Sequence, residues 1–297
     1  MTAVPVTRPV VRLDSVEVDP LGATGRKKVP ADDPYLAGHY PQLALWPGVF
    51  LIDSAAQVAA RHFAAHQPRL AEAVLAEVAS VRFLRPVLPG DEYEVRVEPA
   101  GPAGVVRVRC LVGRELAARM TLRLAVPEPA VPEPAAPEPI LLSCPVDADP
   151  RRLLPHRPPM LLVDLVLAAG ALSVVTQKVV RPDEPCFAGA PAGALAWPSP
   201  FVLESFAQSC GVLWALAAER ACRPVPGLLV FGAARGVTFP RPVPVGAVLT
   251  HTVRLEQAVG EDAAMFTGSA RVDGQLVLSV EGATALLRPA EALAGTP

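Results

Sequence analysis

Two long stretches of the chain are hydrophobic at almost every position. They cover residues 48–65 and 201–218, and each has a Gly or Ser near its start. A run of this length without a polar face predicts a helix that is buried on all sides. Other elements must therefore cover each of these two helices.

The segments that follow each apolar run alternate between hydrophobic and polar residues. The clearest are 93–98 and 105–109 after the first run, and parts of 249–255 after the second. Alternation of this kind is typical of strands that are buried on one face. The Asp-Gly pair at 273–274 predicts a tight hairpin, and Gly113 lies at the matching place in the first half. One buried helix followed by antiparallel strands predicts an α+β fold that occurs twice in the chain.

A proline-rich segment separates the two parts. Residues 126–140 read VPEPAVPEPAAPEPI. Proline at every second or third position removes backbone donors and keeps the chain extended, which makes a semi-rigid spacer. We therefore predict an N-terminal half over residues 1–125, a linker over 126–142 and a C-terminal half over 143–297.

The two halves repeat the same order of residues. Each has a loop position, a Trp-Pro pair, a helix start, a carboxylate and a glutamine. In the first half these are His39, Trp46-Pro47, Gly48, Asp53 and Gln57, and in the second they are Ala190, Trp197-Pro198, Ser199, Glu204 and Gln208. The carboxylate follows the loop position by 14 residues in both halves. This agreement predicts an internal duplication.

Composition narrows the classes of function. Hydrophobic residues make up 51% of the chain and charged residues 19%, which is typical of a globular protein. The formal net charge is -2 and no block of like charges occurs, so we expect no nucleic-acid partner and no membrane partner. The 5 cysteines are widely spaced and include no Cys-x-x-Cys, which favours neither disulfides nor a thiolate zinc site. We expect a cytoplasmic protein, because no segment resembles a signal peptide and no apolar run approaches the ~20 residues of a membrane span.

Polar residues of the repeat have the chemistry of general acid–base catalysis. A histidine has an ordinary pKa near ~6.5 and can act as a base at neutral pH, which makes His39 a candidate. Glu204 is the only charged residue in its apolar run, and a carboxyl group buried in this way can stay protonated and act as an acid. The first N–H groups of a helix, at Gly48 and Val49, can polarise a carbonyl oxygen. Gln208, one turn after Glu204, either orients the acid or only satisfies its own hydrogen bonds.

Five segments are specific enough to indicate a family. They are GHYP at 38–41, WPG at 46–48, RFLRPVLPGD at 82–91, LPHRPPMLLVD at 154–164 and ESFAQ at 204–208. These segments resemble the hot-dog-fold 3-hydroxyacyl-acyl-carrier-protein dehydratases, and the tandem is similar to the double hot-dog dehydratase domains of polyketide synthases. The resemblance implies two antiparallel sheets, each wrapped around a long central helix, that pack as a pseudo-dimer within one chain.

The same resemblance implies a reaction. It is the elimination of water from a 3-hydroxyacyl thioester to give a 2-enoyl thioester, in fatty acid or polyketide biosynthesis. The implied carrier is the phosphopantetheine of an acyl carrier protein or of CoA, and neither a metal nor a further cofactor is implied. Other hot-dog enzymes stay open as alternatives, namely a thioesterase, an enoyl hydratase or a double-bond isomerase. A further alternative is that the chain is not an enzyme but a non-catalytic acyl-carrier-binding protein.

The resemblance also implies that the two sites of the chain are unequal. In the family, the histidine and the carboxylate of one site come from different protomers. One composite site would contain His39, Gly48, Glu204 and Gln208. The other would contain, at the matching positions, Ala190, Ser199, Asp53 and Gln57. The second set lacks a base, so we predict one working site and one degenerate site, in which Asp53 keeps a structural role. We also predict a mostly apolar tunnel beside His39.

Three other histidines have simpler explanations in the sequence. His62 and His66 have the i, i+4 spacing of metal ligands, but no third ligand suggests itself. We therefore expect both at the solvated end of the first long helix. For His156 and its neighbour Arg157, packing and capping are the favoured interpretation.

Overall fold

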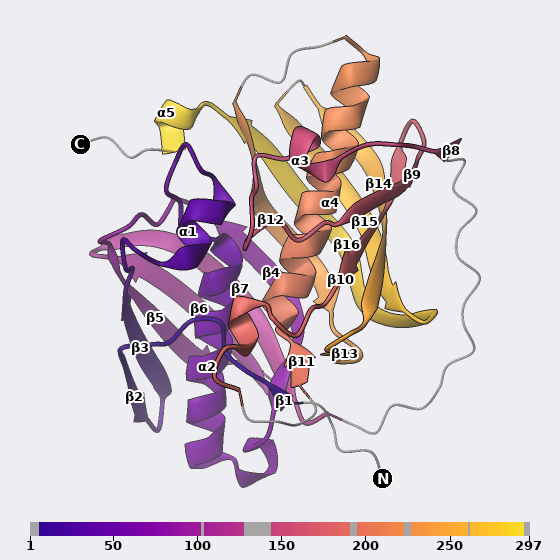
Figure 1. Cartoon of the computed structure of the whole chain (residues 1–297). Coiled ribbons are helices and arrows are strands. Elements are labelled where there is room, and N and C mark those ends of the chain that lie inside the picture. Colours follow the sequence, from indigo (N-terminus) through magenta and orange to yellow (C-terminus); the bar gives the residue numbers. More distant parts are fainter. Residues whose placement is uncertain are drawn as a thin grey trace.

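The computed structural model of the chain consists of two halves that share one large sheet (Figure 1). It describes residues 6–101, 104–127, 144–190, 195–222, 227–260 and 262–293. Residues 128–142 of the predicted linker lie outside the described residues, so the boundaries of the two halves stay predictions.

The described part of the first half contains two α-helices, one 3-10 turn and seven strands. The helical elements are α1 (Pro34–His39), α2 (Gly48–His66) and η1 (Pro68–Leu70). The strands are β1 (Val6–Thr7), β2 (Ser15–Asp19), β3 (Gly22–Lys28), β4 (Val74–Phe83), β5 (Glu92–Pro99), β6 (Val105–Val112) and β7 (Glu115–Ala125). Strands β5 and β6 include the alternating segments at 93–98 and 105–109, as the sequence predicts.

The described part of the second half repeats the order of a long helix followed by a series of strands. Its helical elements are α3 (Pro150–Leu153), η2 (Pro185–Phe187), α4 (Ser199–Arg220) and α5 (Ala290–Leu293). Its strands are β8 (Cys144–Pro145), β9 (Leu165–Ala169), β10 (Ser173–Val179), β11 (Leu195–Trp197), β12 (Leu228–Thr238), β13 (Val243–Pro244), β14 (Val248–Val259), β15 (Ala263–Val272) and β16 (Gln275–Arg288).

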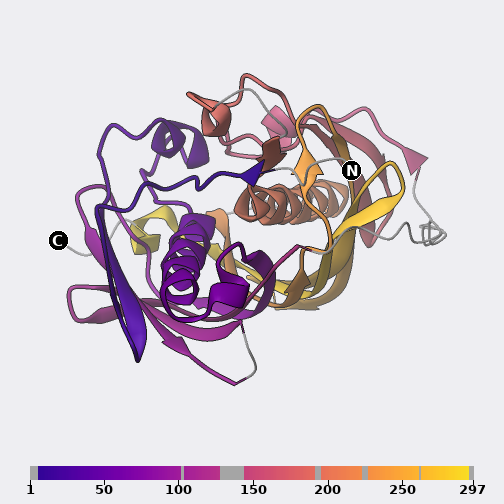
Figure 2. The same ribbon diagram turned by 90° about the horizontal axis from the view of Figure 1, so that it is seen from below.

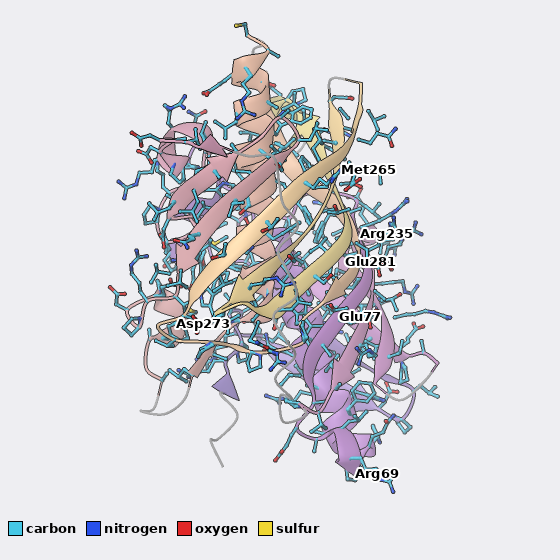
Figure 3. The ribbon with its side chains drawn as sticks, turned by 90° about the vertical axis from the view of Figure 1, so that its right-hand side faces the viewer. Arg69, Glu77, Arg235, Met265, Asp273 and Glu281 are labelled. Carbon is cyan, nitrogen blue, oxygen red and sulfur yellow. The ribbon has the colours of Figure 1, made fainter. Side chains whose placement is uncertain are left out.

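One antiparallel pair of strands joins the two halves. Among the described residues, the main sheet has 13 strands in the order β2-β3-β5-β6-β7-β4-β12-β16-β15-β14-β10-β9-β8. Strand β4 of the first half pairs with β12 of the second, with Val81 opposite Ala234. Glu77 of β4, Arg235 of β12 and Glu281 of β16 lie on the outer face of the sheet at this junction (Figure 3). The two repeats are therefore joined edge to edge, so neither leaves this edge strand unpaired.

The two long helices lie on the inner face of the sheet, which curves around them (Figure 2). Helix α2 contacts α4, and the rings of Phe50 and Phe201 are 5.9 Å apart between centroids. Full burial of such a side chain contributes about 1.5–3 kcal/mol, so apolar packing holds the helices together. Contrary to the expectation from the sequence, α4 is long and apolar enough to cross a membrane by composition. However, 78% of that stretch is buried inside the protein, which identifies α4 as a core helix.

The predicted hairpin forms at the Asp-Gly pair between β15 and β16. Asp273 has φ of 48° and Gly274 has φ of 75°, both in the left-handed region. Two positive φ angles at the centre of a two-residue turn match the right-handed twist of the flanking strands. The matching turn between β6 and β7 also contains a residue with positive φ, Gly113 at 60°.

Candidate active site

His39 is fixed at the end of the short helix α1. The side chain of Asp33 caps the start of this helix by accepting a hydrogen bond from the N–H of Tyr35, and Pro34 occupies its first turn. Nδ1 of His39 lies 2.8 Å from the carbonyl oxygen of Leu45, so Nδ1–H donates there. Nε2 therefore keeps a free lone pair. Burial lowers the pKa of His39 to about 4, against a smaller opposing effect of the Leu45 hydrogen bond, so the ring is neutral near pH 7.

Glu204 lies on the first turns of the buried helix α4 in the second half. Its Oε1 accepts a hydrogen bond of 3.0 Å from Nε2 of Gln208. Burial raises the pKa of Glu204 to about 7, although the Gln208 hydrogen bond lowers it slightly. A carboxyl group in this environment is partly protonated at neutral pH and can give up a proton.

Gln208 is held by the backbone of the segment that precedes β9. Its Oε1 accepts from the N–H of Leu162 at 2.8 Å, and its Nε2 donates to the carbonyl oxygen of Met160 at 2.7 Å. These two contacts fix which end of the amide faces Glu204, because an N–H requires the oxygen and a carbonyl requires the NH₂. Of the two roles left open by the sequence, the geometry therefore favours orientation of the acid.

His156 lies close to both His39 and Glu204, a position that the sequence did not predict. Its Nε2 is 3.7 Å from Oε1 of Glu204, and its ring centroid is 5.4 Å from that of His39. The cause is a close approach of helix α1 and the loop after α3, since the N–H of Arg157 donates to the carbonyl oxygen of Gly38 at 2.8 Å. A Cβ at Gly38 would lie 2.4 Å from the Arg157 oxygen, so this contact requires glycine.

Arg157 itself has the capping role that the sequence suggested. Its guanidinium donates to the carbonyl oxygens of Leu154, Pro155 and His156. His156 does pack as expected, since its buried ring contacts the rings of His39 and Tyr40, but the sequence did not predict that this ring would lie among the candidate catalytic groups. Each of the GHYP and LPHR segments contains a histidine and could have marked a site residue. Only the contact of the two segments in space shows that these histidines lie together.

The candidate groups border one cavity of about 570 Å³. Its lining includes His39, Gly48, Val49, Glu204 and Gln208, which come from both halves of the chain. Most of the remaining lining is apolar and includes Leu45, Trp46, Leu154, Trp214, Leu229, Phe231 and Leu286. A mostly apolar cavity with a few convergent polar groups suits a ligand that has a hydrocarbon part and one polar part.

The start of α2 presents backbone donors to this cavity. Gly48 and Val49 are the first two residues of the helix, so their N–H groups have no intrahelical acceptor. A Cβ at Gly48 would lie 3.0 Å from the ring of Phe83, so only glycine fits without a shift of that ring. This arrangement could polarise a carbonyl oxygen placed in the cavity.

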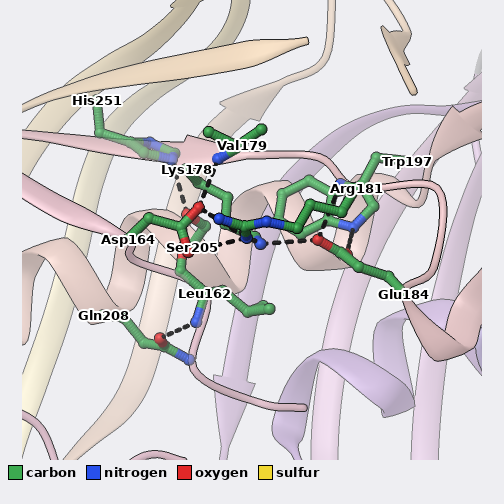
Figure 4. A network of polar contacts seen from close by, with 10 residues as sticks. All are labelled: Leu162, Asp164, Lys178, Val179, Arg181, Glu184, Trp197, Ser205, Gln208 and His251. Carbon is green, nitrogen blue, oxygen red and sulfur yellow. Dashed lines mark hydrogen bonds and ion pairs between the residues drawn. The ribbon is translucent and has the colours of Figure 1, made fainter. Parts of the chain in front are cut away.

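A buried network behind the site fixes the segment that holds Gln208 (Figure 4). Ser205 donates to the carbonyl oxygen of Leu162 at 2.6 Å and lies 2.8 Å from Nε2 of His251. In the same network, Nζ of Lys178 lies 2.7 Å from Oε1 of Glu184 and 3.7 Å from Oδ2 of Asp164. Ser205 and the Lys178 ion pairs therefore hold the 162–164 segment from two sides.

We expect Lys178→Met to lower the free energy of unfolding by about 3–5 kcal/mol, because it leaves the poorly solvated carboxylate of Glu184 without its cation, whereas Asp164 keeps Arg181 at 3.2 Å. The Lys178 side chain is only 4% exposed. Urea denaturation followed by circular dichroism would measure the change. Lys27→Met is the control, since Lys27 pairs with the half-exposed Asp14 and should cost about 1 kcal/mol or less. Equal losses in the two variants would contradict this assignment.

Comparison with known proteins identifies the family. The ApeI-like family model, described as ApeI dehydratase, matches residues 16–117, and the ApeP-like model, described as ApeP dehydratase, matches residues 148–293. The 3-hydroxyacyl-[acyl-carrier-protein] dehydratase FabZ of Pelotomaculum thermopropionicum is 40% identical over 122 residues, which are 39% of this chain and 86% of that enzyme. FabZ of Symbiobacterium thermophilum is 36% identical over 142 residues, 44% of this chain and 99% of that enzyme. The chain belongs to the 3-hydroxyacyl-[acyl-carrier-protein] dehydratase family.

Solved structures of dehydratases match the fold of the tandem chain. The dehydratase domain of PpsC from Mycobacterium tuberculosis has a TM-score of 0.66 at 17% identity, over 95% of this chain and 100% of that domain. The dehydratase domain of RzxB from Pseudomonas fluorescens has a TM-score of 0.66 at 14% identity, over 92% of this chain and 97% of that domain. The predicted α+β double hot-dog fold of this dehydratase is thereby confirmed.

The carboxylate of the other half-site has a different environment in this dehydratase. Oδ2 of Asp53 accepts hydrogen bonds from the N–H groups of Val10 and Val11 at 3.0 and 2.9 Å. The same oxygen accepts from Nε2 of Gln57 at 2.9 Å, and that amide also donates to the Val11 carbonyl oxygen. Burial raises the pKa of Asp53 to about 6, although these hydrogen bonds lower it in part. Asp53 therefore anchors the N-terminal segment, whereas Glu204 faces two histidines.

The rest of the predicted degenerate site also lacks reactive groups. Ala190, at the position of His39, is half-buried and offers only its backbone, which donates to Phe187. Ser199 begins α4, and Pro200 follows it at the position of Val49. Proline has no N–H, so this helix start has lost one of the two donors that α2 keeps. The missing N–H at Pro200 therefore adds to the missing base, on which the prediction of a degenerate site rests.

His62 and His66 differ from the sequence expectation in one respect. His66 is exposed at the end of α2, as expected, but His62 is buried at 2% exposure. Its Nδ1 lies 3.1 Å from the carbonyl oxygen of Gly22 on β3. The expectation of a solvated His62 was wrong because β3 covers that side of the helix.

Proposed function

We propose that the chain removes water from a 3-hydroxyacyl thioester at the single site formed by His39 and Glu204. One observation carries this proposal. A neutral imidazole and a partly protonated carboxyl group, one from each half, place a ring nitrogen and a carboxyl oxygen within 4.8 Å of each other at an apolar cavity. The family relationship supplies the substrate class, a 3-hydroxyacyl group on an acyl carrier protein, and CoA is the other carrier with the same phosphopantetheine arm.

The proposed reaction needs one base and one acid. Nε2 of His39 takes a proton from C2 of the substrate, and that electron pair forms the C2–C3 double bond. The C3–O bond breaks while Glu204 gives its proton to the departing hydroxyl, which leaves as water. The N–H groups of Gly48 and Val49 stabilise the negative charge that develops on the thioester oxygen. A proton then returns from His39 to Glu204, and the resting state is restored.

Gln208 and the apolar cavity supply positioning. The amide of Gln208 keeps Oε1 of Glu204 in one orientation through its 3.0 Å hydrogen bond. The apolar walls remove water from the acyl chain and strengthen the electrostatic interactions at the site. The reaction needs no further cofactor in this scheme, and we propose that it takes place in the cytoplasm.

The test uses a 3-hydroxyacyl pantetheine thioester as substrate. Dehydration gives an enoyl thioester with increased ultraviolet absorbance and no free thiol. A thioesterase would instead release the thiol, which a thiol reagent detects, and an isomerase would leave the hydroxyl in place. Binding without turnover would indicate an acyl-carrier-binding protein. Any of these three results in place of the enoyl product contradicts the proposal.

The pH profile of the dehydration rate should be bell-shaped, with its acidic limb set by His39 and its basic limb set by Glu204. The base must be unprotonated, and the pKa of His39 is about 4, so activity is lost as the pH falls through that value. The acid must be protonated, and the pKa of Glu204 is about 7, so activity is lost as the pH rises through it. Measurement of kcat/KM from pH 4 to pH 9 checks this. A rate that increases steadily above pH 7 would contradict the assignment of Glu204 as the acid.

A further inference from the structure

Three side chains at the active site form a candidate metal-binding cluster. His39, His156 and Glu204 each offer one ligand atom, and these atoms all lie within 4.8 Å of one another. Among the described residues, this is the one group of three His, Cys, Asp or Glu side chains with such an arrangement. We propose that the cluster binds a zinc ion, and that the bound ion blocks the active site instead of assisting it.

The donor set is the one that zinc prefers. Two imidazoles, one carboxylate and an open fourth position form a tetrahedral zinc site. His39 is oriented as a ligating histidine usually is, because its Nδ1–H donates to a backbone carbonyl and Nε2 is left available to an ion. Nδ1 of His156 has no hydrogen-bond partner among the described residues, and Nε2 faces Glu204.

The distances need only a small adjustment. Zinc–ligand bonds of ~2.0–2.2 Å put two ligand atoms of a tetrahedral site about 3.4 Å apart. The His156–Glu204 pair is already at 3.7 Å, and the longest separation in the cluster is at most 4.8 Å. Side-chain movements of the order of 1 Å would close the remaining gap. The cavity gives an ion access to the three groups and leaves room for a water molecule as the fourth ligand.

The ion and the substrate would need the same atoms. Zinc occupies the lone pair of His39 that takes the substrate proton, and it holds Glu204 as a carboxylate that has no proton to give. Inhibition should therefore be reversible and competitive with the thioester. This consequence rests on the proposed function, whereas binding of the ion does not.

His62 and His66 provide the matched control. They are the other close pair of histidines in the described chain, with ring centroids 4.9 Å apart. His62 is already engaged with the carbonyl oxygen of Gly22, and no third ligand completes that pair among the described residues. Removal of the exposed His66 should therefore leave zinc binding unchanged.

The experiment titrates the purified full chain with ZnCl₂ by calorimetry, and with CoCl₂ by visible absorption, since tetrahedral Co²⁺ absorbs strongly. We expect one ion per chain in both titrations. His156→Ala and Glu204→Gln should each weaken binding at least ~10-fold, because loss of a ligand costs no less than loss of a supporting residue. His66→Ala should bind as the unaltered chain does. Circular dichroism establishes that each variant is folded.

Two results would overturn the proposal. One is no saturable binding up to about 1 mM ZnCl₂, the range of weak association. The other is binding that is lost in His66→Ala but kept in His156→Ala, which would place the ion at the end of α2. Zinc inhibition that a chelator reverses supports the blocking role. If the chain binds zinc at this cluster but dehydrates no thioester, the proposed function fails while the metal site stands.

Discussion

Replacing His39 with alanine is expected to lower kcat for dehydration at least ~10²-fold, since a general base typically contributes 10²–10⁴-fold. The substitution removes the one imidazole nitrogen that is held neutral and unpaired at the cavity by a backbone hydrogen bond. It also leaves the carbonyl oxygen of Leu45 without this partner, which costs about 1–3 kcal/mol, so the variant should still fold. Steady-state kinetics on the purified variant give the effect, with circular dichroism as the check on folding.

The control for this experiment is a histidine remote from the cavity. His66 is exposed at the end of α2, so His66→Ala should keep the turnover of the unaltered enzyme. His156→Ala tests the nearest competitor for the role of base. If that variant loses activity while His39→Ala stays within a few-fold of normal, the base is His156. Because His156 and Glu204 both belong to the second half, such a result would overturn the role of His39 and also the proposal that each half supplies one catalytic group.

The architecture was largely predictable because its signals are local and repeated. An apolar run without a polar face must be buried, and α2 and α4 begin within two residues of the predicted starts at 48 and 201. The repeated 14-residue spacing drew attention to His39 and Glu204, and the structure places both at one cavity. Once the two repeats lie side by side, the pairing of β4 with β12 follows, because each repeat has an edge strand whose backbone N–H and C=O groups need hydrogen-bond partners.

The missed residues depend on contacts that no local pattern contains. His156 reaches the site because the chain after α3 packs on Gly38, more than one hundred positions earlier in the sequence. Burial of His62 depends on β3, which precedes α2 and crosses it. For Asp53 a structural role was predicted, but its partners were not, because the N–H groups that donate to its carboxylate belong to the N-terminal segment. In each case the contacts of the side chain come from a part of the chain that is distant in sequence.

The difference between the two buried carboxylates has a further consequence for mutagenesis. Glu204 and Asp53 occupy matching places on α4 and α2, and each accepts a hydrogen bond from a glutamine one turn later. Burial raises the pKa of both, to about 7 and about 6 respectively. A tendency to be protonated therefore does not separate them. Their neighbours do, because Glu204 faces His39 and His156 at the cavity, whereas Asp53 faces backbone N–H groups.

We accordingly expect Glu204→Gln to lower kcat at least ~10²-fold and Asp53→Asn to keep it within a few-fold. Glutamine preserves the volume and the hydrogen bond from Gln208 but cannot transfer an acid proton to the leaving hydroxyl. Asparagine should be tolerated at position 53 because a single oxygen, Oδ2, accepts all three hydrogen bonds there, and the amide oxygen can replace it. Kinetics on the two variants, with thermal denaturation of each, separate the roles. If folded Asp53→Asn loses activity while Glu204→Gln keeps it, the working site is the composite site that contains Asp53 and Ala190. If both variants keep normal activity, the proposed mechanism has no basis.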